Sequence, residues 1–97
     1  MTRAWVYMLT NRPDGVLYTG MCNADLQRRI WEHREGGGSS FTDKYNCKRL
    51  VWFSAFEHVT AAAEQERRIK RWKRAWKVEL IEQANPDWRD LYPDISG

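Results

Sequence analysis

The chain has 97 residues, of which 42% are hydrophobic and 30% are charged, with a formal net charge of +3. This length suits one domain, and the balance of apolar and charged residues excludes a collagen-like, low-complexity or disordered chain. The apolar runs are far shorter than the roughly 20 residues of a membrane-spanning helix, no signal peptide opens the sequence, and the two cysteines form no C-x-x-C pair. We therefore expect a cytoplasmic protein with no membrane partner.

Residues 5–11 and 16–20 predict a β-hairpin. Both runs are rich in Val, Tyr, Leu and Thr, and the Arg-Pro-Asp-Gly between them favours a turn. In the antiparallel pairing that this turn implies, Tyr7 lies opposite Gly20, and Tyr18 lies two positions along. The two tyrosines are then diagonal neighbours about 7–8 Å apart on one face, and their phenol groups point into the same space.

A helix is predicted after Asp25, which can accept backbone N–H bonds as an N-cap. Leu26, Ile30 and His33 recur at helical spacing and predict its buried face. Arg29 projects from the same side because it lies one helical turn before His33. The helix therefore brings an arginine and a histidine together.

The middle of the chain combines a loop and a strand. Residues 36–40 are Gly-Gly-Gly-Ser-Ser, and they lack the Gly-Lys-Ser/Thr ending of a P-loop. We interpret them as a loop that needs conformational freedom, with a phosphate cradle as the alternative. Residues 50–56 are apolar apart from Ser54, which predicts a strand that is buried on both faces and central in a small sheet.

Residues 61–83 form the longest predicted helix, with Thr60 as its N-cap. On a helical wheel the buried stripe consists of five residues: Ala62, Ile69, Trp72, Trp76 and Leu80. Glu66 falls on the edge of this stripe, whereas Glu64 falls on the opposite face. A carboxylate beside a buried stripe is costly unless it is paired or binds a cation, so Glu66 either pairs with Lys73 or holds a metal ion.

Charge is distributed unevenly along the chain. Residues 64–79 contain seven basic residues against three glutamates, a local balance of +4 that exceeds the net charge of the whole chain. A basic face of this kind predicts a polyanionic partner, and a solvated helix face is the alternative. Residues 84–97 are mildly acidic and lack a regular period, so we expect an irregular tail packed on or near the domain, in a position where it could cover the basic helix.

The side chains that could carry chemistry form an unusual set. The histidines and cysteines lack the close pairs that structural zinc sites use, and no hydrolase, zincin or dinucleotide motif is present. What remains is two tyrosines on adjoining strands, an arginine and a histidine on one helix face, and a glutamate on another helix. Phosphodiester hydrolysis needs such groups: a base for water, cations for the phosphoryl oxygens and commonly a carboxylate-held divalent ion.

Several short motifs, in order, resemble the GIY-YIG nuclease domain. They are Trp-Val-Tyr at residues 5–7, Tyr-Thr-Gly at 18–20 and Asp-Leu-Gln-Arg-Arg-Ile at 25–30, followed by His33. Later blocks look like those of the small stand-alone bacterial members, and the resemblance covers about residues 4–83. It implies an α+β fold in a single domain over residues 1–83, with a small central antiparallel three-stranded sheet flanked by helices, before the tail.

The resemblance also implies a role for each residue of a candidate site. Tyr7 matches the tyrosine that acts as general base toward water, and Tyr18 the one that positions the water or the scissile phosphate. Arg29 matches the arginine that stabilises the transition-state phosphate, and His33 a histidine that assists by hydrogen bonding. Glu66 matches the glutamate that binds a single divalent ion, Mg²⁺ or Mn²⁺.

The partner implied by the resemblance is DNA. Residues expected to contact it are Gly20, Arg28, Lys70, Lys73 and Arg74. Six tryptophans and the basic segment favour single-stranded or branched DNA, RNA stays open as a partner, and no particular protein partner is indicated.

Three positions depart from the family's motifs, of which Val6 in place of isoleucine is a mild change. Trp5 replaces the first glycine, and its large ring either narrows access to the site or stacks on an unpaired base. Thr19 replaces the usual isoleucine or valine. We therefore expect a metal-dependent endonuclease. The alternatives are a non-catalytic nucleic-acid-binding module on the same fold and an adaptor whose basic helix docks an acidic partner.

Overall fold

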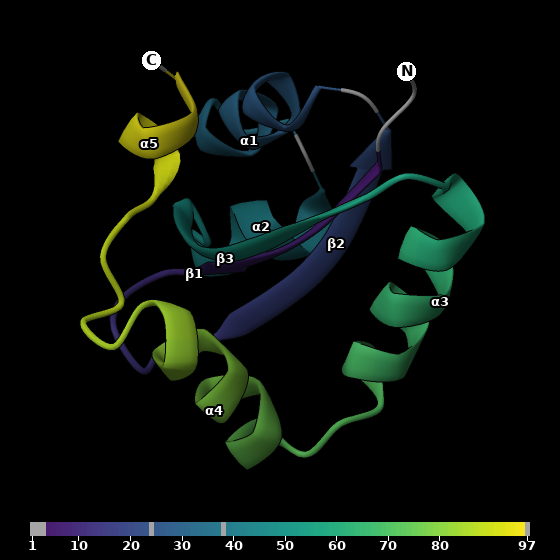
Figure 1. The fold of residues 1–97 in the computed structure, drawn as a ribbon. Helices are drawn as coiled ribbons and strands as arrows, with labels where there is room; N and C mark the ends of the chain where they lie inside the picture. Colours follow the sequence, from purple (N-terminus) through teal and green to yellow (C-terminus); the bar gives the residue numbers. More distant parts are fainter. Residues whose placement is uncertain (1–3, 24, 38, 97) are drawn as a thin grey trace.

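A three-stranded antiparallel sheet forms the centre of the protein. The computed structural model describes residues 4–23, 25–37 and 39–96. The strands lie in the order β2, β1, β3 and comprise β1 (Ala4–Thr10), β2 (Leu17–Asn23) and β3 (Arg49–Phe56). Helices cover both faces of this sheet (Figure 1), which confirms the expected α+β fold. In the described part of the chain, no helix has the length and apolar character needed to cross a membrane.

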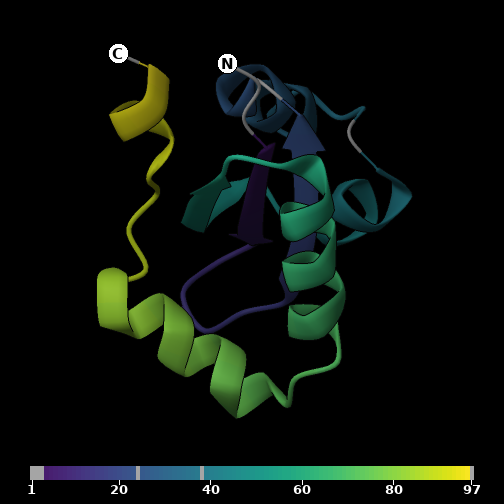
Figure 2. The same ribbon diagram turned by 45° about the vertical axis from the view of Figure 1, so that its right-hand side comes forward.

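The two faces of the sheet carry separate apolar clusters. Successive strand residues point to opposite faces, so Tyr7 lies on one face and its neighbour Val6 on the other. The Tyr7 face is covered by α1 (Leu26–Arg34), α2 (Ser40–Tyr45) and α5 (Tyr92–Ser96). The Val6 face is covered by α3 (Val59–Lys70) and α4 (Arg74–Ala84). Figure 2 shows α3 lying along β1 and β2, the two strands against which it mainly packs.

The hairpin of β1 and β2 has the register that the sequence predicts. Tyr7 pairs with Gly20, and Leu9 pairs with Tyr18. The predicted first helix is also confirmed. The side chain of Asp25 caps it by accepting the backbone N–H of Arg28, and the residues buried along it are Leu26, Ile30 and His33.

The single helix predicted over residues 61–83 is two helices in the structure. The chain leaves the helical conformation at residues 71–73 and turns before α4 begins. A straight helix from the start of α3 to the end of α4 would be roughly 39 Å long at about 1.5 Å per residue, which exceeds the largest extent of the molecule, 34 Å. The break lets Ile69 of α3 and Ile81 of α4 enter the same apolar cluster.

The break also overturns part of the predicted buried stripe. Ala62 and Ile69, which precede it, are fully buried. Trp76, which follows it, is 53% exposed because α4 has turned away from the line of α3. The predicted N-cap is wrong as well, since α3 begins after His58 and not after Thr60.

β3 is an edge strand and not the central strand that the sequence predicts. Its outer edge is covered by the tail, which satisfies backbone groups that an edge normally exposes. The N–H of Leu91 donates to the carbonyl oxygen of Leu50 at 2.7 Å. The N–H of Leu50 donates to Asp90 Oδ1 at 3.2 Å. Asn85 Nδ2 donates to the carbonyl oxygen of Val51 at 3.1 Å. This cover explains why an edge strand has a continuous apolar run.

The acidic tail does not cover the basic helix, contrary to one expectation. Asp90 pairs with Arg34 of α1 at 2.8 Å, and Asp94 pairs with Arg89 within the tail at 2.9 Å. The tail, expected to be irregular, ends in the short helix α5, which lies beside α1 (Figure 1). Its carboxylates therefore leave the cations of α3 without cover.

Candidate active site

Tyr7, Tyr18, Arg29 and His33 form one cluster between the hairpin and α1. The ring centroids of the two tyrosines are 6.4 Å apart, and each lies 5.6 Å from that of His33. The Arg29 guanidinium reaches toward Tyr7 from α1, close enough for its charge to favour the ionised phenol. The fold thus brings together four of the residues to which the sequence assigns a catalytic role.

Because Gly20 has no side chain, the two phenol rings can lie against its backbone. A Cβ atom at this position would be 2.7 Å from both Cζ and the hydroxyl oxygen of Tyr7, and 2.9 Å from Cε2 of Tyr18. Carbon atoms do not approach so closely, because favourable packing begins at about 3.5 Å. Glycine is therefore required by the rings on either side, whether or not nucleic acid also contacts it.

A chain of hydrogen bonds orients His33. Its Nε2 lies 2.8 Å from the Tyr7 hydroxyl, and its Nδ1 lies 3.0 Å from Thr42 Oγ1. The Thr42 hydroxyl lies 2.9 Å from Ser39 Oγ and 3.2 Å from the carbonyl oxygen of Ser39. If it donates to that carbonyl, it accepts from a protonated Nδ1. Nε2 is then unprotonated, and the Tyr7 hydroxyl donates to it. Ser39 is the N-cap of α2, so the start of that helix positions the hydroxyl that meets His33.

Burial sets the protonation states of this chain. It raises the pKa of Tyr7 well above its ordinary value, and the opposing effects of the Arg29 hydrogen bond and charge are smaller. Burial, aided by the charge of Arg29, lowers the pKa of His33 to about 4. At neutral pH the phenol is therefore protonated and the imidazole is neutral, which is the combination that the hydrogen-bonding pattern requires.

The cluster is open to solvent on one side only. Tyr7 and His33 have no exposed surface, whereas the Arg29 side chain is 31% exposed and Tyr18 is half-buried. Arg29 also pairs with Glu32 at 3.2 Å. Beside Tyr18 stands the exposed ring of Phe41, with centroids 5.8 Å apart. A ligand entering from solvent would meet Tyr18, Phe41 and the guanidinium before the two buried rings.

Glu66 comes from a different helix than the residues of this cluster. It belongs to α3, which packs on the opposite face of the sheet, and its carboxylate pairs with Lys70 of the same helix at 3.4 Å. The alternative partner, Lys73, is instead the N-cap of α4 and lies 6.0 Å from the ring of Trp76. Glu66 is partly buried and Glu64 is exposed, as the wheel predicts.

Glu66 would hold a metal ion as a single carboxylate. Among the residues that the structure describes, no group of three or more His, Cys, Asp and Glu side chains could hold one. Mg²⁺ is commonly bound through one or two carboxylates while it keeps several waters and takes further oxygens from substrate phosphates. A carboxylate that is 22% exposed and held by one exposed lysine suits this kind of site.

The other residues expected to contact nucleic acid lie on exposed surfaces, with the exception of Gly20. Arg28 is on α1, where it pairs with Glu32 at 3.6 Å. Arg74 begins α4 and pairs with Asp14 of the hairpin turn at 3.2 Å. Arg28 is thus on the helix of the tyrosine cluster, while Arg74 is on the other face of the sheet with Lys70 and Lys73.

Trp5 belongs to the apolar packing of the sheet. Its ring meets that of Phe53 edge to face, with centroids 6.0 Å apart. It also borders a hollow together with Asp25, Gln27 and Ile95. Its large ring therefore packs across the sheet on Phe53.

Sequence reasoning missed the supporting residues Ser39, Phe41 and Thr42. Their signal was local: a serine before a short helical segment is typical of an N-cap, and α2 begins directly after Ser39. The role of Thr42 toward His33 depends on how two helices meet, which no local pattern encodes.

The chain matches the model of the GIY-YIG catalytic domain over residues 3–79. Among its relatives, a UPF0213 protein of Clostridium perfringens is 38% identical over 77 residues, which are 79% of this chain and 81% of that protein. A UPF0213 protein of Staphylococcus saprophyticus is 31% identical over 84 residues, 87% of this chain and all of that protein. The chain therefore belongs to the GIY-YIG catalytic domain family.

A solved structure supports the same assignment. The solution NMR structure of a UPF0213 protein from Bacillus halodurans is similar with a TM-score of 0.56 and 31% sequence identity. The similarity covers 91% of this chain and 92% of that one, so it extends over the sheet and both helical layers.

Proposed function

We propose that this protein is a metal-dependent endonuclease that hydrolyses phosphodiester bonds of DNA, with single-stranded or branched DNA as its preferred substrate. The observation that carries the proposal is the cluster of Tyr7, Tyr18, Arg29 and His33 in a member of the GIY-YIG family. The cluster combines a cation that can bind a phosphate, Arg29, with two hydrogen-bonded groups that can transfer a proton, Tyr7 and His33.

Arg29 and Tyr18 contact the scissile phosphate in this proposal. The partly exposed guanidinium stabilises the negative charge that grows on the phosphoryl oxygens during attack. Its position is fixed before substrate arrives by Glu32 and Tyr7, so little reorganisation is needed. The phenol of Tyr18 stands at the solvent side of the cluster and orients the water or the phosphate.

Tyr7 and His33 move the proton of the attacking water. Because burial holds the phenol in its protonated form, a free phenolate is not the base at neutral pH. Instead, Tyr7 accepts the proton of water while its own proton passes to Nε2 of His33 over 2.8 Å. The burial of Tyr7 means that substrate binding must admit one water molecule beside Tyr18.

Glu66 would hold the divalent ion, Mg²⁺ or Mn²⁺. When bound, such an ion supplies positive charge to the phosphoryl oxygens. The chain's own contribution would be the carboxylate on α3, which pairs with Lys70 at 3.4 Å. Binding of the ion there would free Lys70 to meet a phosphate of the substrate.

Cleavage assays with purified protein test the proposal. We expect cutting of single-stranded, duplex or branched DNA with Mg²⁺ or Mn²⁺, and none after EDTA is added. Arg29→Ala and Glu66→Ala should abolish cutting without changing the circular dichroism spectrum, whereas Arg89→Ala, on the exposed tail, should cut normally. Undiminished cutting by Glu66→Ala would refute the metal assignment. RNA substrates in the same assay test the breadth of the activity.

A second function is a nucleic-acid-binding module without turnover. Two observations favour it: Tyr7 has no exposed surface, and Glu66 is paired with Lys70 on the other face of the sheet. In that case DNA binding falls steeply with salt, no metal produces cutting, and Tyr7→Phe leaves affinity unchanged.

A further inference from the structure

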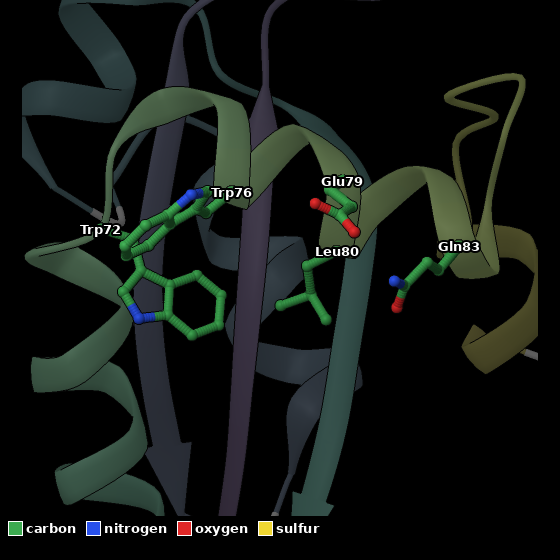
Figure 3. A pocket seen from close by; sticks show the side chains of 5 residues that line it. All are labelled: Trp72, Trp76, Glu79, Leu80 and Gln83. Atoms are coloured by element: carbon green, nitrogen blue, oxygen red, sulfur yellow. The ribbon is translucent and has the colours of Figure 1, made fainter.

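Two adjoining hollows lie where α3 ends and α4 begins, and both are lined by Trp72 and Trp76. The first has a volume of about 370 Å³ and is completed by Glu79, Leu80 and Gln83 (Figure 3). The two indole rings meet edge to face, with centroids 6.4 Å apart. Trp76 is 53% exposed, so one indole of this pair is available to a partner.

The second hollow has a volume of about 530 Å³ and adds cations to the same two rings. The charged residues that line it are Glu64, Arg67, Arg68 and Arg71. In this segment, the ion pairs among described residues are those of Lys70 with Glu66 and of Arg74 with Asp14. The three arginines form none, so they are available to an anionic partner.

We propose that these two hollows, which we call the tryptophan corner, bind an unpaired strand of nucleic acid. Stacking on exposed aromatic rings is the way in which proteins hold unpaired bases, and Trp76 offers such a ring. Arg67, Arg68 and Arg71 meet the phosphates, because they are exposed cations that outnumber Glu64 in this hollow and form no ion pair with a described residue. Glu79 and Gln83 line the first hollow and offer acceptors and a donor to the edges of a stacked base.

Charge and ring geometry together favour this occupant over others. A duplex would satisfy the arginines, but its bases are already stacked on one another and leave nothing for Trp76. An acidic protein segment would also neutralise the arginines, but it carries no base that could stack on the exposed indole. An unpaired strand carries both phosphates and free base faces.

The tryptophan corner is distinct from the tyrosine cluster of the candidate active site. α3 and α4 pack on the Val6 face of the sheet, whereas the tyrosine cluster lies on the Tyr7 face. The inference rests on the part of the proposed function that names nucleic acid as the partner, and it does not depend on cleavage. The corner would anchor the strand, and the tyrosine cluster would act on another part of it.

Binding of a fluorescein-labelled twelve-residue oligothymidylate, measured by anisotropy without metal, tests the inference. We expect Trp76→Ala to weaken binding about tenfold, since stacking of one base contributes ~1–3 kcal/mol, and Trp76→Phe to retain most of the affinity. Arg71→Ala should weaken binding and reduce the slope of log K against log salt by about 0.7 for each phosphate that the variant leaves unneutralised. Heparin, a polyanion without bases, should bind Trp76→Ala as well as it binds the unmodified chain.

Matched controls separate this surface from others. Trp31→Ala removes a tryptophan that is 52% exposed on α1, and Arg89→Ala removes an exposed arginine of the tail; both should bind the oligonucleotide normally. The assay contains no metal and scores binding alone, so a failure of the nuclease proposal would not be mistaken for a failure of this one. Unchanged oligothymidylate binding by Trp76→Ala would overturn the inference. The inference would also be overturned if sedimentation showed a dimer that Trp76→Ala alone dissociates while the affinity for oligothymidylate stays the same.

Discussion

The hydroxyl of Tyr7 lies 2.8 Å from Nε2 of His33, and neither side chain has exposed surface. The hydrogen bond joins the central strand to the first helix and places a proton donor against a neutral acceptor. The same pair therefore stabilises the fold and can carry a proton. Substitutions should separate these two contributions because one can be measured by unfolding and the other by cleavage.

Removing the Tyr7 hydroxyl should impair cleavage far more than stability. In Tyr7→Phe the ring still fills its place, but His33 loses the group that donates to Nε2. We expect single-turnover cleavage to fall about 10²- to 10⁴-fold, as for other general acid-base groups, and the free energy of unfolding in urea to fall by about 1 kcal/mol. Tyr45→Phe, on an exposed ring of α2, should alter neither. Equal cleavage by both variants would exclude the proton transfer through Tyr7.

Stability should fall in mild acid because of His33. Burial lowers its pKa from 6.5 to about 4 in the folded protein, so the unfolded chain binds more protons between these values. The contribution of neutral His33 to the free energy of unfolding is complete above about pH 6.5. It is lost as the pH falls through 4, and the total loss is about 3 kcal/mol. Urea unfolding at pH 7.5 and pH 4.5 measures this loss. His33→Gln should reduce the difference between the two pH values, while His58→Gln, at an exposed position, should leave it in place.

Local sequence patterns were sufficient for the hairpin and the first helix. The turn between the strands fixes the pairing of Tyr7 with Gly20, and helical spacing after Asp25 places His33 on the buried face. Four of the five predicted catalytic residues lie in these two elements, so they could be found without knowledge of the tertiary structure. The position of Glu66 relative to them could not, because it depends on which face of the sheet α3 covers.

The break between α3 and α4 and the edge position of β3 were not predicted from the sequence, because both depend on long-range packing. Nothing local breaks the helix at residues 71–73, since neither glycine nor proline occurs there; the break instead accompanies the packing of Ile69 and Ile81 into one apolar cluster. The apolar run of β3 predicted a central strand because Leu50 and Val51 are as buried as central residues. Their cover comes from the tail, about 40 residues later in the chain.

A side chain at Gly20 should disturb the tyrosine cluster. Gly20→Ala places a Cβ 2.7 Å from the Tyr7 ring, which the two phenols can relieve only by moving. We expect the free energy of unfolding to fall by about 1–3 kcal/mol, as in other overpacked sites, and cleavage to be lost. Gly37→Ala is the matched control, since a Cβ there meets no atom within 4 Å. If both variants were equally stable in thermal melts, the rings would not be confined as described.

The tail should contribute to stability through Asp90. One carboxylate oxygen, Oδ1, accepts the backbone N–H groups of Leu50 and Tyr92, and the other pairs with Arg34 at 2.8 Å. In Asp90→Ala the N–H of Leu50 loses its partner at the edge of β3, so we expect a loss of about 2 kcal/mol in urea unfolding. Asp90→Asn keeps the acceptor for the backbone but not the charge, and should lose less. Asp87→Ala, at an exposed position of the same segment, should be neutral. Because Asp90 touches none of the four clustered residues, the folded Asp90→Asn protein should cleave at the normal rate, and a lower rate at full folding would mean that the tail also shapes the active site.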